Sequence, residues 1–412
     1  MSALTHAEMV RLLLQVGVLL VAGRLMAEFA RRLNMPTVVG ELVAGVLLGP
    51  TLLGSLNPEV HQWWFPAEGH VATVMDGLTR LALVLLLFVG GLEINLGMIR
   101  SQARRALPIS AGGSILSFAI GFGLGGYIYQ MVPGVTEGGK LVFQLFLGTA
   151  LAITALPVLV RMLLDLDMMR SSTGTVILAA AMIDDVVGWL VFSVILGMAG
   201  TTGAPMRPVM TLITTLVFSG FMLTMGKQLL SWGLPYISKR LSWPGGILSL
   251  TIALCFLCSA FTEAIGLHAI FGAFLAGVVV GDSPFMTDRA KEIVHQFVMN
   301  IFAPLFFISI GLQLNFLSFF NPLIVVLLLA GAFVGKIAGA SLGARFTGSD
   351  WRESLTIGTA MNARGAMEVV LGLVALQSNL ITREVFVALV IVALVTSITS
   401  AGLVKLVLKA GK

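Results

Sequence analysis

The chain has 412 residues, of which 57% are hydrophobic and 11% charged, and its mean hydropathy is +0.99. Charged residues make up about a quarter of a typical soluble domain, so this composition excludes an ordinary soluble protein. The formal charge of +5 does not indicate a nucleic-acid-binding protein, because the basic residues lie in short loops beside apolar segments rather than along one polar face.

Apolar segments of membrane-spanning length fill nearly the whole chain. We count thirteen, and only the ninth is clearly shorter than the roughly 20 residues that a transmembrane helix needs. The first has no small-residue cleavage site behind a short apolar core, so we expect a retained helix rather than a signal peptide. The pattern predicts an all-α polytopic membrane protein with one transmembrane domain over residues 1–412. The predicted spans lie at about residues 8–28, 36–54, 77–97, 106–132, 140–164, 173–198, 207–230, 244–264, 267–282, 291–313, 321–345, 354–378 and 383–409.

The basic residues are distributed unevenly between the two sides of the predicted membrane. Arg104 and Arg105 precede the fourth span, for example, whereas the loop after that span carries only Lys140. Cytoplasmic loops are enriched in Lys and Arg, so this asymmetry predicts an external N-terminus and a cytoplasmic C-terminus. Compact loops and the lack of a transit peptide favour the inner (plasma) membrane of a bacterium.

The sequence contains two copies of one pattern, at about residues 36–198 and 267–409. Three pairs of strings align without gaps and in the same order, and the copies begin seven spans apart, so they enter the membrane from opposite sides. This is an inverted-topology repeat, which is typical of secondary transporters. The pairs are "VVGELVAGVLLGP" from Val38 with "IFGAFLAGVVVGD" from Ile270, "GLEINL" from Gly91 with "GLQLNF" from Gly311, and "LGTALAITALPVLV" from Leu147 with "IGTAMNARGAMEVV" from Ile357.

Two spans carry residues that can interrupt a helix in the middle of the membrane. Pro157 in the fifth span removes a backbone donor and clashes with the preceding turn, although a simple proline kink is the alternative. The twelfth span is polar at the equivalent depth, where Arg364 and Glu368 are spaced to pair along one helix face. Transporters with inverted repeats bind substrate beside such broken helices. The supporting residues predicted at this helix crossing are Thr154, Pro157, Asn362, Arg364 and Glu368.

Three further charges lie deep inside predicted spans: Asp184 and Asp185 in the sixth and Lys336 in the eleventh. The free energy of inserting an aspartate at the membrane centre is about 2.5–3.5 kcal/mol, so we expect the pair to have a function. The second repeat has Leu394 and Val395 at the equivalent positions, which shows that the fold does not require the carboxylates. Oxygen ligands suit a small hard cation, and protons compete for the same oxygens. The alternative is a purely structural ion pair between Asp184 and Lys336.

Six strings in this order resemble the monovalent cation:proton antiporter-2 family, which contains NapA-type sodium/proton antiporters and Kef-type potassium systems. They are "GELVAGVLLGP", "TALPVLVRML", "IDDVVG", "HAIFGAFLAGVVVGD", "FFISIGLQL" and "NARGAMEVVLG". The resemblance implies a thirteen-helix homodimer of the NhaA/NapA-like fold, with the fifth and twelfth spans as its crossed, discontinuous helices. It also implies a core domain at about 106–198 and 321–409 that moves against a dimerisation domain at about 8–97 and 244–313.

The same resemblance assigns roles to individual residues. It implies that Asp185 binds the cation, with Na⁺ expected there, and that Asp184 and Lys336 form a proton-sensitive salt bridge. An Asp-Asp pair is similar to the sodium branch, whereas Kef-type members typically have Gln-Asp. The family often has Arg-Gly-Glu in the twelfth span, but here the glutamate is delayed to Glu368. This departure argues against a ligand role for Glu368 and favours an ion pair with Arg364.

We therefore predict that the protein is a transporter and not an enzyme. We expect an electrogenic antiporter that exchanges intracellular Na⁺ or Li⁺ for external H⁺. We expect it to need no cofactor and to serve pH homeostasis. Its partners would be the two ions, the bilayer and a second copy of the chain. Potassium/proton exchange of the Kef type is the alternative. An intramembrane aspartyl protease is a remote one, because its aspartates belong on two facing helices. An organic-anion symporter is another, although the acidic pair would repel the anion.

Overall fold

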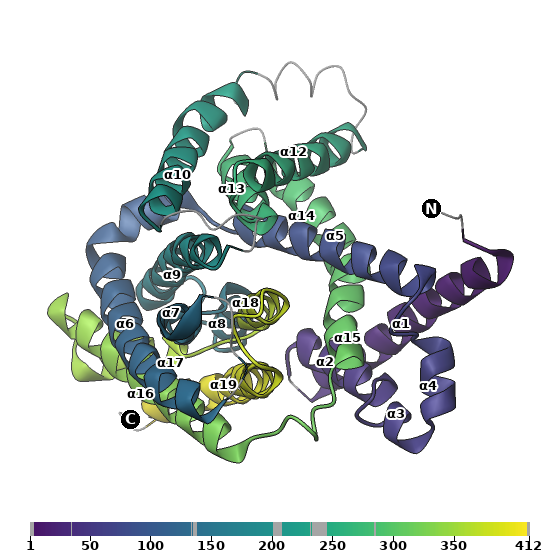
Figure 1. Ribbon diagram of the computed structural model, residues 1–412. Helices are drawn as coiled ribbons and strands as arrows, with labels where there is room; N and C mark the ends of the chain where they lie inside the picture. Colours follow the sequence, from purple (N-terminus) through teal and green to yellow (C-terminus); the bar gives the residue numbers. More distant parts are fainter. Residues whose placement is uncertain are drawn as a thin grey trace. The chain divides into compact units, whose positions relative to one another are not determined.

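The computed structural model describes residues 4–33, 35–132, 134, 138–200, 208–230, 232, 245–283 and 286–409, and within these ranges it contains helices and no strands (Figure 1). Eleven helices are long and apolar enough to cross a membrane, or twelve when the bent pair Trp351–Met361 and Ala366–Gln377 counts as one span. The ninth predicted span is the shorter apolar helix Ala269–Gly281. The predicted all-α membrane fold is confirmed, and these helices are consistent with about thirteen spans.

Where the structure describes the connections between consecutive helices, these connections are short. Two five-residue stretches, η1 and η2, are π-helical. In chain order the elements are α1 (His6–Arg32), α2 (Thr37–Leu48), α3 (Leu53–Leu56), α4 (Pro58–Trp64), α5 (His70–Leu92), α6 (Leu96–Met131), α7 (Gly139–Ala152), α8 (Leu156–Asp165), α9 (Ser172–Met198), α10 (Pro208–Phe221), η1 (Met222–Gly226), α12 (Gly245–Ala264), α13 (Ala269–Gly281), α14 (Asp288–Phe297), η2 (Val298–Phe302), α15 (Ala303–Gln313), α16 (Pro322–Phe346), α17 (Trp351–Met361), α18 (Ala366–Gln377) and α19 (Arg383–Lys409).

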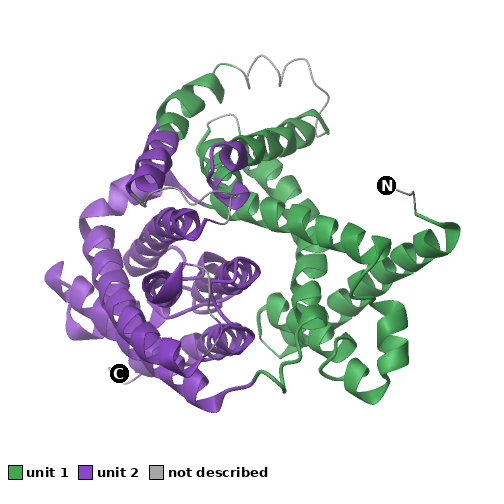
Figure 2. Cartoon of the chain, viewed as in Figure 1, with its two compact units in different colours: residues 1–93, 221–261, 272–319 green, residues 94–220, 262–271, 320–412 purple. Residues whose placement is uncertain are grey.

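Contacts within the chain divide it into two units, each built from separate stretches of sequence (Figure 2). Both units draw on both predicted repeats. The predicted roles of a moving core and a dimerisation domain remain predictions, because contacts within one chain do not test them. Unit 1 comprises Met1–Glu93, Phe221–Phe261 and Gly272–Phe319, and unit 2 comprises Ile94–Gly220, Thr262–Phe271 and Phe320–Lys412.

Unit 1 contains two glycine contacts that repeat one pattern. A Cβ atom placed on Gly311 of α15 would lie 2.6 Å from the Cα atom of Gly45 in α2. A Cβ atom placed on Gly91 of α5 would lie 3.0 Å from the Cα atom of Gly277 in α13. The aligned repeats match Gly91 with Gly311 and Gly45 with Gly277, so the two contacts are equivalent. Each repeat therefore packs its glycine-bearing helix against the other repeat, which accounts for the matched glycines in the sequence.

Helix α6 is longer than the apolar segment that predicted it. The Asn95 side chain accepts a hydrogen bond from the backbone N–H of Met98 at 2.8 Å, and this cap starts the helix at Leu96. The first turns are polar and basic, so hydropathy alone assigned them to a loop. The N-cap residue was the available sequence signal for the earlier start.

Helices α6 and α16 run side by side in unit 2 (Figure 1). A Cβ atom on Gly112 would lie 2.5 Å from the backbone oxygen of Gly339, and one on Gly335 would lie 2.8 Å from the Cα atom of Ser117. Such close backbone approach is typical of helix pairs inside membranes. The pairing fixes the position of Lys336, which follows Gly335 on α16, relative to the polar face of α6.

We predict that Gly112→Ala lowers the thermal stability of the purified protein in detergent, whereas Gly123→Ala on the same helix does not. The new methyl at residue 112 forces α6 and α16 apart, and overpacking of this kind costs about 1–3 kcal/mol. No atom lies within 4 Å of a Cβ at Gly123. Equal melting temperatures for the two variants, measured by fluorescence-detected size exclusion after heating, would contradict the close packing of this pair.

Candidate functional site

Helix α9 holds the two adjacent aspartates near its middle. Its N-cap is Ser171, whose hydroxyl accepts a hydrogen bond from the backbone N–H of Gly174 at 2.9 Å. The side chains of Asp184 and Asp185 follow more than three helical turns later, and the two residues are only 2% and 3% exposed. Neighbouring residues on a helix point about 100° apart, so the two carboxylates face different surroundings.

Asp184 accepts four hydrogen bonds from side chains of four different residues. Its Oδ1 atom accepts from the hydroxyls of Ser110 at 2.5 Å and Ser114 at 2.7 Å, both on α6. Its Oδ2 atom accepts from the hydroxyl of Thr154 at 3.0 Å and from the ammonium of Lys336 at 2.6 Å. Each oxygen therefore has two donor groups within hydrogen-bond distance, and donors of this kind stabilise a buried carboxylate.

Lys336 connects the carboxylate to the end of a broken helix. Its side chain is completely buried and donates to the backbone oxygen of Ala152, the last residue of α7, as well as to Asp184. Asp185 and Arg364 also lie within electrostatic range of this ammonium. The expected ion pair of Asp184 with Lys336 is present, and the same ammonium also serves as a cap for α7.

The fifth and twelfth predicted spans are both interrupted. Helices α7 and α8 are separated by residues 153–155, and α17 and α18 by residues 362–365 with a bend of 45°. The two breaks are joined directly, because the backbone N–H of Ala155 donates to the backbone oxygen of Ala363 at 2.9 Å. Pro157 lies in the first turn of α8, where its missing N–H costs nothing, so it marks the start of a new helix rather than a kink.

The two breaks also exchange side-chain contacts in a symmetric way. The hydroxyl of Thr154 lies 3.0 Å from the backbone oxygen of Met361 as well as 3.0 Å from Asp184 Oδ2, so its single proton is shared between the two acceptors. The guanidinium of Arg364 donates to the backbone oxygen of Leu151. The aligned repeats match Thr154 with Arg364 and Leu151 with Met361, so these are equivalent interactions. Arg364 additionally donates to the oxygen of Ala150 at 2.8 Å.

Glu368 pairs with Arg364 one turn along the chain. The distance between the Arg364 Nη1 and Glu368 Oε1 atoms is 3.3 Å, and both side chains are 1% exposed. The expected ion pair is therefore present.

Asn362, the C-cap of α17, is completely buried, and neither its Oδ1 nor its Nδ2 atom has a hydrogen-bond partner among the described residues.

The structure thus brings Thr154, Asp184 and Lys336 into direct contact. Of the other predicted residues, Asp185 follows Asp184 on α9, Asn362 and Arg364 lie at the second break, and Pro157 and Glu368 lie in the first turns of α8 and α18. The sequence interpretation missed Ser110 and Ser114. Their available signal was the spacing of four residues within the apolar fourth span, which puts both hydroxyls on one helix face. Among the described residues, no group of three or more His, Cys, Asp or Glu side chains could hold a resident metal ion.

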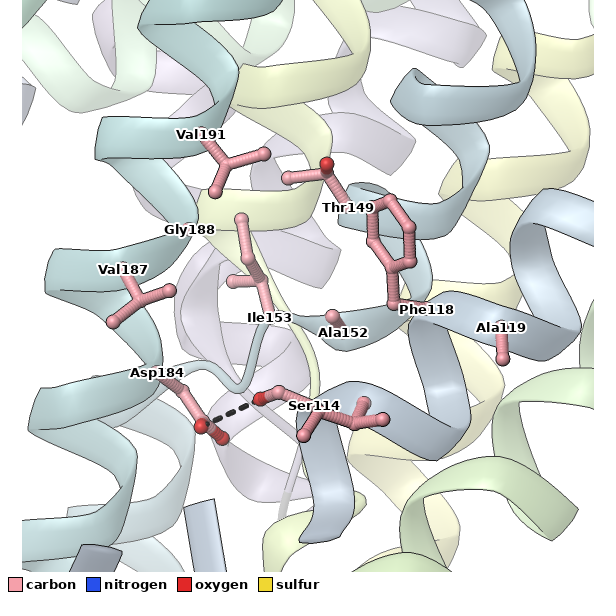
Figure 3. A pocket seen from close by; sticks show the side chains of 11 residues that line it. Ser114, Phe118, Ala119, Thr149, Ala152, Ile153, Asp184, Val187, Gly188 and Val191 are labelled. Carbon is pink, nitrogen blue, oxygen red and sulfur yellow. Dashed lines mark hydrogen bonds between the residues drawn. The ribbon is translucent and has the colours of Figure 1, made fainter. Parts of the chain in front are cut away.

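A cavity of about 280 Å³ lies beside Asp184, between α6, α7 and α9 (Figure 3). Ser114 points from α6 toward the Asp184 carboxylate at one end of this cavity, where Figure 3 marks their hydrogen bond. Most of the remaining lining is apolar, including Phe118, Ile153 and Val187.

Comparisons with known proteins agree with this architecture. Residues 17–410 match the family described as "Sodium/hydrogen exchanger, transmembrane". Cation/H(+) antiporter 17 of Arabidopsis thaliana is 30% identical over 409 residues, which are 97% of this chain and 49% of that protein. The chain thus spans about half the length of this relative. Na(+)/H(+)-K(+) antiporter GerN of Bacillus cereus is 29% identical over 395 residues, 95% of each chain.

A solved structure shows the same fold. The sodium proton antiporter MjNhaP1 of Methanocaldococcus jannaschii superposes with a TM-score of 0.64 at 18% sequence identity, covering 98% of this chain and 99% of the other. The match in sequence to the family covers almost the whole chain, and the helical architecture agrees with it. The chain therefore belongs to the transmembrane family of sodium/hydrogen exchangers, which are transporters and not enzymes.

Proposed function

We propose that the chain is a secondary active antiporter that exchanges intracellular Na⁺ or Li⁺ for external H⁺ by alternating access. The observation that carries the proposal is the buried ion pair of Asp184 and Lys336 beside a second buried carboxylate, Asp185, where two broken helices meet. Ionisable groups inside membranes are costly and mark ion and proton pathways. Relatives named as cation/H⁺ and Na⁺/H⁺-K⁺ antiporters support the same class of function.

The hydrogen bonds of Asp184 indicate how cation and proton can exclude one another. Both of its oxygens are occupied by donors, so a cation gains access to this carboxylate only when a donor leaves. The ammonium of Lys336 is the donor whose charge a cation replaces. Asp185 is the second carboxylate, and we assign the cation to it, with Asp184 completing the site once Lys336 has withdrawn.

This exchange predicts the movement of net charge. At high internal pH the site loses its protons and binds Na⁺, the binding unit rearranges, and external protons then displace the ion. If Asp185 and Lys336 each take up a proton per Na⁺ released, two positive charges enter for each one that leaves. A membrane potential then contributes about 2.3 kcal/mol per charge per 100 mV. No cofactor takes part in this scheme.

Potassium/proton exchange is the second candidate, because the name of GerN includes both Na⁺ and K⁺. Oxygen ligands alone do not decide between the two ions. We further propose that the protein is a homodimer in a bacterial plasma membrane, with an external N-terminus, a core domain that moves against a dimerisation domain, and a role in pH homeostasis.

We predict that proteoliposomes containing the protein move protons in response to Na⁺ and Li⁺ between about pH 6.5 and 9, and that Asp185→Asn abolishes the response. The amide cannot carry the charge that pairs with the cation. A response to K⁺ alone would favour the second candidate. No response to any of the three cations in a folded preparation would reject the antiporter proposal.

We predict that Lys336→Gln weakens or abolishes the voltage dependence of exchange, because the variant loses one of the two proton carriers. The measurement compares Na⁺-driven proton movement at zero and at imposed negative potential, with the wild-type protein as reference. Exchange that remains equally voltage-dependent in Lys336→Gln would show that Lys336 does not carry a transported proton.

We predict that Arg364→Ala strongly destabilises the protein, whereas Arg170→Ala at an exposed position has little effect. Removing Arg364 leaves Glu368 as a buried charge without its partner and frees the backbone oxygens of Ala150 and Leu151. Breaking a buried ion pair typically costs about 3–5 kcal/mol. The readout is the melting temperature in detergent. Equal melting temperatures for both variants would argue against a structural role for this arginine.

A further inference from the structure

The cavity between α6, α7 and α9 has no polar side chain in its wall that lacks a partner. The polar side chains of the wall are Ser114, Thr149 and Asp184. Ser114 donates to Asp184, whose two oxygens each have two donor groups within hydrogen-bond distance. The hydroxyl of Thr149 donates to the backbone oxygen of Leu145 in its own helix at 2.9 Å. The rest of the wall consists of glycine and apolar side chains, and Figure 3 shows several of these beside the carboxylate.

This wall favours an apolar occupant over water or an ion. A buried water molecule typically makes about three hydrogen bonds, whereas an apolar cavity of about 150 Å³ can stay dry and bind small apolar molecules. The cavity here has a volume of about 280 Å³. Side chains that line an unfilled space of this size lose dispersion contacts, which a hydrocarbon ligand restores.

Exposed apolar residues border the cavity near the middle of two predicted membrane spans. Ile115 on α6 is 69% exposed and Val187 on α9 is 46% exposed. Val187 lies eleven residues before Met198, the nearer end of its helix, which corresponds to about 16 Å along the axis. The hydrocarbon core of a bilayer is about 30 Å thick, so the opening lies at the depth of the bilayer centre.

A phospholipid presents only the ends of its acyl chains at this depth. The border of the cavity also offers nothing to a charged head group, because residues 106–131 of α6 include no charged side chain. The charged residues of α9 are Asp184 and Asp185, and both are buried. Depth and wall chemistry therefore select the same ligand, which is the hydrocarbon end of a lipid.

We propose that this cavity is a binding site for the end of a phospholipid acyl chain. The chain enters between α6 and α9, past Ile115 and Val187, and lies against Phe118 and Ile153. It covers the wall beside Asp184 and keeps water away from this side of the carboxylate. Charge-assisted hydrogen bonds are stronger in such a low-dielectric environment. This proposal does not rest on the proposed antiport function.

The test uses two photoreactive phosphatidylcholines that differ only in the position of a diazirine group on one acyl chain. One lipid has the diazirine next to the terminal methyl group, and the other has it next to the ester. The purified full chain is reconstituted with each lipid and illuminated, and the labelled residues are identified by peptide mass spectrometry. We expect the terminal probe to label Ile153, which lines the cavity but is only 2% exposed. We expect no label there from the ester-proximal probe.

A matched pair of variants on α9 tests whether the label depends on the cavity. Val191 lines the cavity, so the larger ring in Val191→Phe occupies the space of the chain. Val194 is half-buried on the same helix and does not line the cavity. We expect the label on Ile153 to be lost in Val191→Phe and retained in Val194→Phe. The label on the exposed Ile115 should persist in both variants.

Three results would overturn the proposal, and the first two need only the wild-type protein. The first is a terminal probe that labels Ile115 but not Ile153, because lipid would then contact only the outer surface. The second is the absence of label on both residues, which would show that something other than lipid, such as a second copy of the chain, covers the opening. The third is a label on Ile153 that persists in Val191→Phe. None of these measurements depends on ion exchange, so the lipid site and the proposed function can fail separately.

Discussion

The structure of unit 2 depends on one requirement: a backbone oxygen at the end of a helix needs a donor even where no water reaches it. Helix α7 ends at Ala152, inside a buried region, and its last three oxygens have no partner within the helix. Arg364 donates to the first two of these oxygens and Lys336 to the third. Positive charge also suits the negative end of a helix dipole. The side chains of Lys336 and Arg364 are therefore needed to satisfy the backbone of α7, whether or not an ion is bound.

Lys336 and Arg364 both donate to the end of α7, but the chemistry of the two side chains differs. The guanidinium of Arg364 has enough donors to serve two backbone oxygens and Glu368 together. It is suited to a permanent structural contact. A buried lysine can lose its proton, and Lys336 serves Ala152 and Asp184 with one ammonium. Any change in its charge or position must alter the contacts of both the end of α7 and the carboxylate.

Much of this site could be predicted from the sequence, because charged side chains and interrupted helices have a high free-energy cost inside a membrane. Asp184, Asp185 and Lys336 stood out in apolar spans, and the repeat located the equivalent breaks near Pro157 and Arg364. The matched glycines predicted the repeat and now account for close helix contacts in unit 1. For the charged residues, the signal was a side chain that an apolar helix would otherwise avoid.

The remaining features had no such signal. Serine is common in membrane helices, so Ser110 and Ser114 did not stand out, and only the pairing of α6 with α9 brings them to Asp184. The backbone oxygens that Lys336 and Arg364 satisfy belong to alanine and leucine residues. The side chains of these residues do not indicate that the backbone oxygen needs a donor from another helix. The start of α6 was predicted too late because its first turns are polar. Contacts between distant helices and backbone acceptors are set by the fold and are not encoded at any single position.

The two repeats have the same helical arrangement, but they contribute different charged side chains to the site. The aspartate pair and the last three backbone oxygens of α7 belong to the first repeat, whereas Lys336 and Arg364 belong to the second. At the symmetric position of Arg364 the first repeat has only the neutral donor Thr154. Glu368 is the one carboxylate of the second repeat in this region, and Arg364 pairs with it. The ion pair of Asp184 with Lys336 therefore joins the two repeats through opposite charges. In the exchange proposed above, a cation bound at the aspartates competes directly with this contact.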